Sequence, residues 1–257
     1  MLDTRTPSVA RAYDHLLSGE ANFAADRALA GRLLALYPRL QDTLISSRRQ
    51  VADAVGRIAG HGVDQYVDVG AGLPTRPSTH ATVRALLPAA RVVYVDRDPL
   101  VVEHGADLVP PGVRYHSGDL TEPEALLATL SYRHASAAPA QPPAPEAAGF
   151  LDLARPVCLV LALVVQALDP GTARAVVGVL VKALPPGSYL VATLGAGDAG
   201  RLPDSVWPSA ATEAELAPFF GGLDLLPPGI SRHGEVLSGV GVKPYPGRPH
   251  DSGRPRG

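Results

Sequence analysis

The sequence is poor in cysteine, in aromatic residues and in long apolar runs. Its single cysteine, Cys158, cannot form an intramolecular disulfide, which predicts a protein of the reducing cytoplasm. The longest apolar run, residues 157–165, is too short to span a bilayer, and the first residues lack the apolar core of a secretory signal. Neither a zinc-ligand spacing nor a catalytic triad is recognisable, so we expect no resident metal ion.

An excess of either charge is also missing. The 23 basic and 25 acidic residues give a formal net charge of −2, so no overall positive field favours nucleic acid or an anionic membrane as a partner. The 257 residues, 46% of them hydrophobic, suffice for one sizeable core with a small appended element. We therefore expect a small-molecule ligand, and the sequence leaves a monomer and a dimer equally open.

The most informative stretch is residues 65–75, Gln-Tyr-Val-Asp-Val-Gly-Ala-Gly-Leu-Pro-Thr. β-Forming residues, interrupted by Asp68, lead into Gly70 and Gly72, which let the backbone turn sharply. Residues 77–79 then supply a helix start signal. The pattern predicts a strand, a glycine turn and a helix, which form the first half of a βαβ unit.

A second predicted strand, residues 91–96, ends in Asp96 at the distance expected for the other half of that unit. In nucleotide-binding α/β sheets an acid at this place binds the ribose hydroxyls, while bare glycines admit the ligand to the backbone. A dinucleotide site would carry a third glycine where this chain has Thr75. We therefore expect a different adenosine-containing ligand, although a glycine turn alone can also simply join a strand to a helix.

Three helices are predicted before the sheet, at about residues 7–17, 22–37 and 40–59. They form a predicted helical cap over residues 1–60. Asn22 and Asp26 would share one helix face at positions i and i+4. The spacing leaves two interpretations open, because Asn22 can be a helix N-cap with Asp26 on a solvated face, or both can line a site.

Strands and helices alternate through the rest of the chain. After helix 100–108, strand 113–119 ends in Asp119, which can contact an adenine or cap the next helix. The further elements are a helix at 122–130, an apolar strand at 156–165, a helix at 171–184, a strand at 187–193, a helix at 213–220 and strands at 223–226 and 236–242. This alternation predicts an α/β fold with a doubly wound, mostly parallel sheet over residues 61–243, closed by an antiparallel pair. An Ala/Pro-rich insertion at 134–149 and a tail at 244–257 are expected to be flexible and disordered.

Several longer motifs make the sequence resemble an actinobacterial family of S-adenosylmethionine (SAM)-dependent methyltransferases that long carried only a domain-of-unknown-function label. The motifs are Arg-Ala-Tyr-Asp-His-Leu-Leu-Ser-Gly at 11–19, Asn-Phe-Ala-Ala-Asp-Arg at 22–27, Gly-Ala-Gly-Leu-Pro-Thr at 70–75, Val-Tyr-Val-Asp at 93–96 and Leu-Pro-Pro-Gly-Ser-Tyr-Leu at 184–190. The resemblance implies the seven-stranded Rossmann-like sheet of class I methyltransferases with an N-terminal helical cap. It also implies SAM as cofactor and S-adenosylhomocysteine (SAH) as product.

The resemblance further implies a set of cofactor-binding residues. They are Asp68, Gly70, Ala71, Gly72, Leu73, Asp96, Arg97, Asp119, Leu120, Tyr13, Asn22, Asp26 and Arg49. In this reading the residues around the glycine turn shape the methionine pocket, Asp96 holds the ribose and Asp119 the adenine edge. The cap residues close over the cofactor, and Arg48 or Arg49 pairs with its carboxylate.

Methyl transfer needs a nucleophile held in line with a sulfonium methyl group, and an oxygen or nitrogen nucleophile can need a base. The candidates for that base near the predicted mouth are Tyr13, Asp14, His15 and His80. Each has an alternative role: His15 and His80 can be surface or packing residues, and Tyr13 can be a ring over the cofactor.

Four positions depart from the family pattern, and the segment between Leu194 and Thr212 is shorter than usual. Glu20 stands where a basic residue is usual, Arg48 and Ser78 where Asn is usual, and Gln166 where His is usual. The leading hypothesis is a small-molecule methyltransferase, in secondary metabolism. The departures keep open a SAM-binding protein without methyl transfer, acting as a sensor, a partner subunit or a repurposed scaffold. A nicotinamide-dependent reductase rests only on the sheet and Asp96, and the missing third glycine counts against it.

Overall fold

The computed structural model describes residues 3–130, 150–196 and 211–247. The predicted insertion at 134–149 and residues 248–257 of the predicted tail lie outside these ranges. Within the described ranges, no helix combines the length and the hydrophobicity that a membrane span requires.

The chain begins with three helices, α1 (Val9–Leu16), α2 (Ala24–Leu36) and α3 (Leu40–Gly60). Helix α1 ends where Ser18 takes a positive φ of 63°. Helix α2 begins after Phe23, whose backbone N–H donates to Asp26 Oδ2 at 2.8 Å. The helix therefore begins two residues after the start predicted near Asn22. Asn22 lies before the helix, so it does not share a helix face with Asp26. Asp26 itself caps the helix from within its first turn.

In the part of the chain that the structure describes, the sheet has eight strands. Seven of them follow the order β3-β2-β1-β4-β5-β8-β6, and β7 also pairs with β8. Their bounds are β1 Gln65–Val69, β2 Arg91–Asp96, β3 Val113–Ser117, β4 Cys158–Ala162, β5 Tyr189–Gly195, β6 Asp224–Leu225, β7 Ser231–His233 and β8 Val236–Val242. The first five strands run parallel, and β8 is antiparallel to β5, β6 and β7. The predicted doubly wound, mostly parallel sheet closed by an antiparallel pair is confirmed, with the short β7 added to the seven strands expected.

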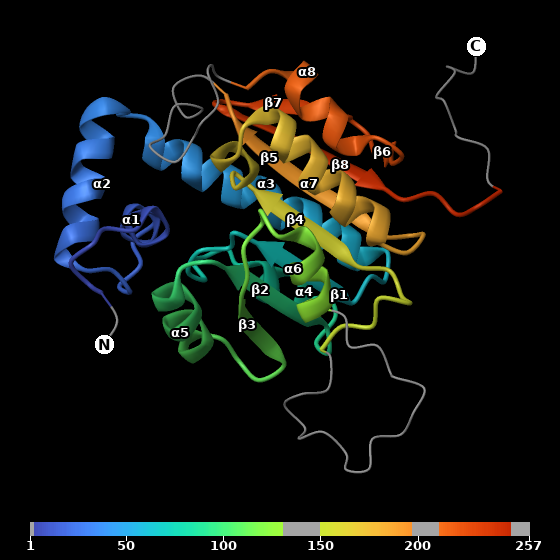
Figure 1. Ribbon diagram of the computed structural model, residues 1–257, viewed down its shortest axis with the longest axis horizontal. Coiled ribbons are helices and arrows are strands. Elements are labelled where there is room, and N and C mark those ends of the chain that lie inside the picture. The colour runs from blue at the N-terminus through green and yellow to red at the C-terminus, as the bar shows by residue number, and fades with distance from the viewer. Residues whose placement is uncertain (1–2, 131–149, 197–210, 248–257) are drawn as a thin grey trace.

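Helices cover both faces of the sheet. The remaining helices are α4 Thr79–Arg84, α5 Pro99–Leu108, α6 Pro123–Leu130, the 3-10 turn η1 Val165–Ala167, α7 Pro170–Ala183, α8 Glu213–Leu216 and the 3-10 turn η3 Ala217–Phe220. Side chains of α3, α4 and α5 pack into one apolar core, and those of α6, α7, α8 and η3 pack into the other. Figure 1 shows α6 and α7 in front of the sheet and α3 behind it. Successive residues of β1 point into opposite cores, Tyr66 into the first and Val67 into the second.

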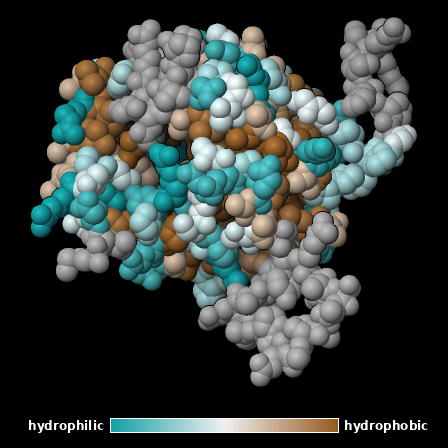
Figure 2. All heavy atoms as spheres, viewed as in Figure 1, coloured by the Kyte–Doolittle hydropathy of each residue, from teal (hydrophilic) through white to brown (hydrophobic). Residues whose placement is uncertain are grey.

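Helices α1 and α2, with the beginning of α3, form a third and separate apolar cluster. They lie at one end of the molecule, beside α5 (Figure 1). Large exposed hydrophobic side chains in the described ranges are scattered over different elements, and hydrophobic and hydrophilic residues are interspersed on the face seen in Figure 2.

Two strands end earlier than the sequence predicts. The apolar run 156–165 forms β4 only to Ala162, because Leu163 takes a left-handed φ of 56° and η1 follows. The strand predicted at 113–119 ends at Ser117. In both places the chain leaves the sheet at its carboxyl end, so the residues after each strand become available to line a site there.

Candidate active site

A cavity of about 540 Å³ lies at the carboxyl ends of β1 to β4, beneath α1. In open α/β sheets ligands bind at this edge, and the volume suits a ligand of cofactor size. Its wall is built from α1 and the segment before it, part of α3, and the segments that follow β1, β2, β3 and β4. The predicted residues that line it are Tyr13, Asp14, Asp68, Gly70, Ala71, Gly72, Leu73, Asp96, Arg97, Asp119 and Leu120.

The turn after β1 depends on its glycines. Gly70 and Gly72 have positive φ angles of 65° and 60°, a conformation that side chains disfavour. A Cβ atom on Gly70 would also lie only 2.1 Å from Cγ2 of Val164. Glycine is therefore required at position 70 both by conformation and by space, which keeps the backbone bare where it borders the cavity.

Asp96 is fixed in position by the backbone around it. Its Oδ2 accepts the N–H of Gly72 at 2.9 Å and its Oδ1 accepts the N–H of Asp98 at 3.0 Å. The side chain is buried, and burial raises the pKa of its carboxyl although these backbone bonds oppose the rise. An oriented carboxylate with free lone pairs in a cavity wall is suited to accept hydrogen bonds from two neighbouring hydroxyl groups.

The floor of the cavity near β1 carries groups of both charges. Asp68 is 2% exposed and accepts the hydroxyl of Thr79 at 2.8 Å. Burial raises the pKa of its carboxyl, and the nearby Arg48 guanidinium acts against that rise. Arg48 lines the cavity and donates to the carbonyl of Ala71 at 3.0 Å. Such a pair matches the ammonium and carboxylate of an amino-acid group.

Thr75 supplies a further polar atom to this wall. Its Oγ1 is buried and has no hydrogen-bond partner among the described residues, although the side chain lines the cavity. A buried hydroxyl of this kind is costly unless something in the cavity bonds to it. Together with Arg48, Asp68 and Asp96, it makes the residues present fit a ligand that carries ribose hydroxyls and an amino-acid group.

The sequence predicts that Arg48 or Arg49 pairs with the cofactor carboxylate. Arg49 is exposed on α3, whereas Arg48 lines the cavity. Two neighbouring helical residues point about 100° apart, and the sequence gives no indication of which of the two faces inward.

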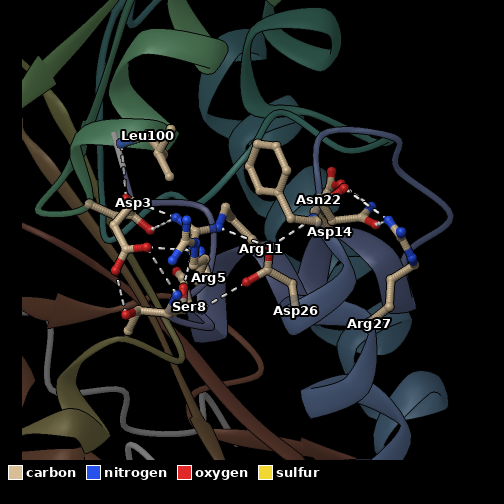
Figure 3. Close-up of polar contacts among 12 residues, drawn as sticks. Asp3, Arg5, Ser8, Arg11, Asp14, Asn22, Asp26, Arg27 and Leu100 are labelled. Carbon is tan, nitrogen blue, oxygen red and sulfur yellow. Dashed lines mark hydrogen bonds and ion pairs between the residues drawn. The ribbon is translucent and has the colours of Figure 1, made fainter. Parts of the chain in front are cut away.

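Two of the predicted cap residues lie behind the cavity wall. Asn22 donates to Asp14 Oδ2 at 3.0 Å and to the carbonyl of Gly19 at 2.9 Å. Asp26 is fully buried in an ion pair with Arg11, 3.0 Å from Nε to Oδ2, and accepts the backbone N–H of Ser8. Figure 3 shows Arg11 beside Asp26, and Asn22 linked to Asp14 and Arg27. Neither Asn22 nor Asp26 lines the cavity.

The two candidate histidines are not in the cavity wall either. His15 is exposed on α1. His80 is half-buried, and both its backbone N–H and its ring Nδ1 lie 2.9 Å from the hydroxyl of Tyr94. Burial lowers the pKa of His80, with Arg84 adding to the effect. These positions give both histidines surface or packing roles, and Tyr13 and Asp14 are the candidate catalytic residues that line the cavity.

Asp119 and the residue after it border the cavity at the end of β3. Asp119 Oδ1 accepts both the backbone N–H and the hydroxyl of Thr121 at 2.8 Å. The backbone bond lowers the pKa of this carboxyl. Asp119 therefore shapes the turn before α6, which begins only at Pro123, and it lines the cavity. Its contact with an adenine stays a prediction.

Arg11, for which the sequence indicates no particular role, joins the cap to the sheet. Besides its pair with Asp26, Arg11 Nη1 lies 3.0 Å from Asp98 Oδ2, and Nη2 donates to the carbonyl of Thr6 at 2.7 Å. Asp98 is the residue whose N–H bonds to Asp96. Arg11 belongs to the 11–19 motif, and that motif is the feature of the sequence that could have indicated its importance. Its two distant partners, Asp26 and Asp98, are visible only in the fold.

The doubly wound sheet, the glycine turn and the oriented acid at the end of β2 are those of a class I SAM-dependent methyltransferase. Residues 1–236 match the family model described as S-adenosyl methyltransferase, and the chain belongs to this family. Its cofactor is accordingly SAM. Among the described residues, no cluster of three or more His, Cys, Asp or Glu side chains could hold a metal ion.

Two solved structures resemble the chain over nearly its whole length. One is a predicted methyltransferase from Thermobifida fusca YX, with 31% identity, a TM-score of 0.80, and coverage of 95% of this chain and 97% of the other. The second is a DUF574 family protein from Streptomyces avermitilis MA-4680, with 29% identity, a TM-score of 0.78, and coverage of 95% and 100%.

A third structure supports the fold alone. It is the N-methyltransferase NodS from Bradyrhizobium japonicum WM9 in complex with SAH, with 14% identity, a TM-score of 0.51, and coverage of 91% of this chain and 100% of the other. No curated protein matches the sequence.

Proposed function

We propose that this enzyme transfers the methyl group of SAM to a small molecule, in a reaction of secondary metabolism. The observation that carries the proposal is that the predicted cofactor residues on the sheet and the inner face of α1 line one cavity of about 540 Å³. An acceptor bound beneath α1 would lie next to the cofactor, which favours a compact molecule over a polymer. The assignment to secondary metabolism rests on the family resemblance.

We assign the cofactor to the sheet side of the cavity. Arg48, Thr75 and Asp68 would hold its amino-acid end, and Asp96 its ribose. Asp119, with Leu120, would border the adenine. When bound, SAM supplies an activated methyl group on a sulfonium centre. The protein then contributes proximity and orientation, and it excludes water through the cap.

The departures from the family pattern lie in different surroundings. Glu20 is exposed, and Ser78 is the N-cap of α4, where its Oγ accepts the N–H of Ala81 at 3.4 Å. Gln166 lines the cavity, and its Oε1 accepts the N–H of Gly195 at 2.8 Å. Arg48 lines the cavity as well. Gln166 and Arg48 therefore bear on the second candidate function, a SAM-binding protein without methyl transfer.

The first test is calorimetric titration of the purified protein with SAM and SAH, beside Asp96→Ala and the control Asp107→Ala. Asp107 is exposed on α5 and outside the cavity. We expect micromolar binding that weakens by about tenfold to a hundredfold in Asp96→Ala, because the hydroxyl groups lose a charged acceptor. Asp107→Ala should bind like the wild type. Equal binding by both variants would remove the ribose role of Asp96.

Methyl transfer is tested with labelled SAM and a broad panel of small molecules. Transfer to any member supports the proposal. Cofactor binding without transfer to any member would favour the non-catalytic alternative, in which case activity in Gln166→His would point to residue 166 as the cause.

We also propose a cytoplasmic location, supported by the single cysteine, Cys158, which is fully buried. The net charge of −2 likewise supports a small-molecule acceptor over a nucleic acid. The protein would act as a monomer or a dimer.

A further inference from the structure

We propose that the methyl acceptor is an amine with an apolar substituent, and that the carboxylate of Asp14 receives its nitrogen. The inference rests on the proposed small-molecule methyl transfer and adds the chemical class of the acceptor. Asp14 lies on α1, so among the described acids that line the cavity it is the one that belongs to the cap.

Asp14 is a buried carboxylate without a cation beside it. It is 5% exposed and lines the cavity from α1. Its Oδ2 accepts the amide of Asn22 at 3.0 Å, and within the described part of the chain its Oδ1 accepts no hydrogen bond and the side chain forms no ion pair. Taking a carboxylate out of water is costly unless a cation or donor compensates. A ligand nitrogen in the cavity would supply that compensation.

The neighbouring arginines are bonded elsewhere. Arg11 is held by the carboxylates of Asp26 and Asp98. Arg27 donates to the backbone and side-chain oxygens of Asn22 at 3.0 and 3.1 Å. Since these side chains already have partners, neither compensates the charge of Asp14.

The position of this carboxylate is rigidly set. A Cβ atom on Gly19 would lie 1.9 Å from Asp14 Oδ1, so the carboxylate packs directly against the glycine backbone. Asn22 ties the same loop together through the carbonyl of Gly19, as Figure 3 shows for its side-chain links to Asp14 and Arg27. A group held in this way is preorganised for one ligand atom.

The cavity as a whole favours a cation. Five aspartates and two arginines line it. Asp68, Asp96 and Asp119 lie on the sheet side, where we place the cofactor, and Asp98 is paired with Arg11. Asp14 remains on the opposite wall for the acceptor.

The cavity also has apolar side chains in its wall. Leu17, Leu44 and Leu163 line it and belong to, or pack against, the apolar cluster of the cap that contains α1. Leu163 adopts a left-handed φ of 56°, which is unfavourable for leucine and is often found at functional sites. An aromatic or aliphatic substituent on the amine would be buried against these side chains.

An amine also fits the bases that the cavity offers. Among the described residues no histidine lines it, and a carboxylate is too weak a base to activate an alcohol efficiently. The ammonium held at Asp14 first releases one proton to water, and the neutral amine that results needs no stronger base. Its nitrogen lone pair attacks the methyl carbon, and the carbon–sulfur bond breaks with its electron pair left on sulfur. The methylated nitrogen then carries the positive charge, so the product is again an ammonium paired with the Asp14 carboxylate until it leaves.

The test compares matched amines and alcohols as ligands of the protein saturated with SAH. Suitable pairs are benzylamine with benzyl alcohol, and phenethylamine with 2-phenylethanol. Calorimetry measures the binding of each compound. We expect the wild type to bind the amine of a pair about tenfold or more tightly than its alcohol, since a charge-assisted bond to a buried carboxylate is lost with the alcohol. In Asp14→Asn this preference should disappear.

The controls separate this inference from general damage and from failure of the proposed function. Asp14→Asn still offers an oxygen to Asn22 and should keep its SAH affinity within about twofold of the wild type, as should Asp53→Asn, an exposed site on α3. The wild-type preference needs no variant, so it is measurable even if Asp14→Asn fails to fold.

Equal binding of the two members of every pair by the wild type, including no binding of either, would overturn the inference. An Asp14→Asn variant that loses SAH as strongly as it loses amines would also overturn it, because Asp14 would then bind the cofactor. Methyl transfer to hydroxyl compounds alone would remove the amine and leave the proposed function standing, whereas failure to bind SAM would remove the proposed function itself.

Discussion

At the scale of single residues, Asp68 is a carboxyl group whose surroundings disfavour charge. Burial raises the pKa of its carboxyl above the ordinary value of 3.8, and Arg48 and the Thr79 hydroxyl only partly oppose this. A raised pKa means that the folded state favours the protonated acid. Asp68 therefore contributes its full stability at low pH, and that contribution is lost as the pH rises through the raised pKa.

We predict that Asp68→Asn is more stable than the wild type at pH 8, by on the order of 1 kcal/mol, because the buried charge is gone. The difference should shrink as the pH falls toward 3.8, where the wild-type acid is protonated. Urea unfolding at several pH values measures it, with Asp53→Asn as the exposed control. A variant that is less stable than the wild type at pH 8 would show that the charge of Asp68 stabilises the fold.

The same variant should bind SAM more weakly if Asp68 contributes to the methionine pocket. A position whose native residue lowers stability and supports a ligand is typical of functional sites. This explains why the interruption of a β-forming run by Asp68 was informative in the sequence, whereas the choice between Arg48 and Arg49 depended on how α3 is rotated against the sheet.

At the scale of elements, the cap is attached to the sheet through Arg11. The Arg11 side chain is 4% exposed and connects α2, through Asp26, with the start of α5, through Asp98. Asp98 bonds in turn to Asp96. The acid predicted to hold the ribose and the helices predicted to close over the cofactor therefore share one network of hydrogen bonds.

We predict that Arg11→Ala destabilises the cap strongly, because it leaves the fully buried Asp26 without its cation. Removing one partner of a buried pair costs about 3–5 kcal/mol. Hydrogen exchange in α1 and α2 should accelerate and SAH affinity should fall, while Arg32→Ala, exposed on α2, should change neither. Unchanged exchange in α1 would mean that apolar packing alone holds the cap.

The sequence predicted some element boundaries and not others, and the difference has a physical explanation. Strands β1 and β2 and helix α3 follow from local β-forming, glycine and helix-periodic patterns. The end of β4 at Ala162 does not, because the apolar run continues and only the tertiary structure forces Leu163 out of the strand. Strand β7 is three residues of Ser, Arg and His, which carry no strand pattern and form a strand only by pairing with β8.

At the scale of the whole molecule, the alternation of strands and helices was enough to predict a doubly wound sheet, and the carboxyl ends of its strands marked the site. The placement of the cap was not predictable in the same detail. It depends on contacts between residues far apart in the chain, such as Arg11 with Asp98. Tyr13 and Asp14 therefore lie in the cavity wall while Asn22, His15 and Asp26 lie behind or outside it.

Because the cavity wall joins α1 to segments after four strands, we predict that SAH stabilises the cap and the sheet together. At one hundred times its dissociation constant the ligand should add about 2.7 kcal/mol of stability, which raises the melting temperature of a chain of this size by roughly 5–10 °C. Hydrogen exchange should slow both in α1 and in the turns after β1 and β2.

In Arg11→Ala, protection by SAH should shrink to the turns of the sheet, since the ligand would still contact them after the cap has lost its attachment to Asp98. Protection restricted to the sheet in the wild type as well would instead mean that α1 does not close over the cofactor. The acceptor would then have to bind against the sheet alone, and the role of Asp14 as the residue that receives it would be lost with the cap.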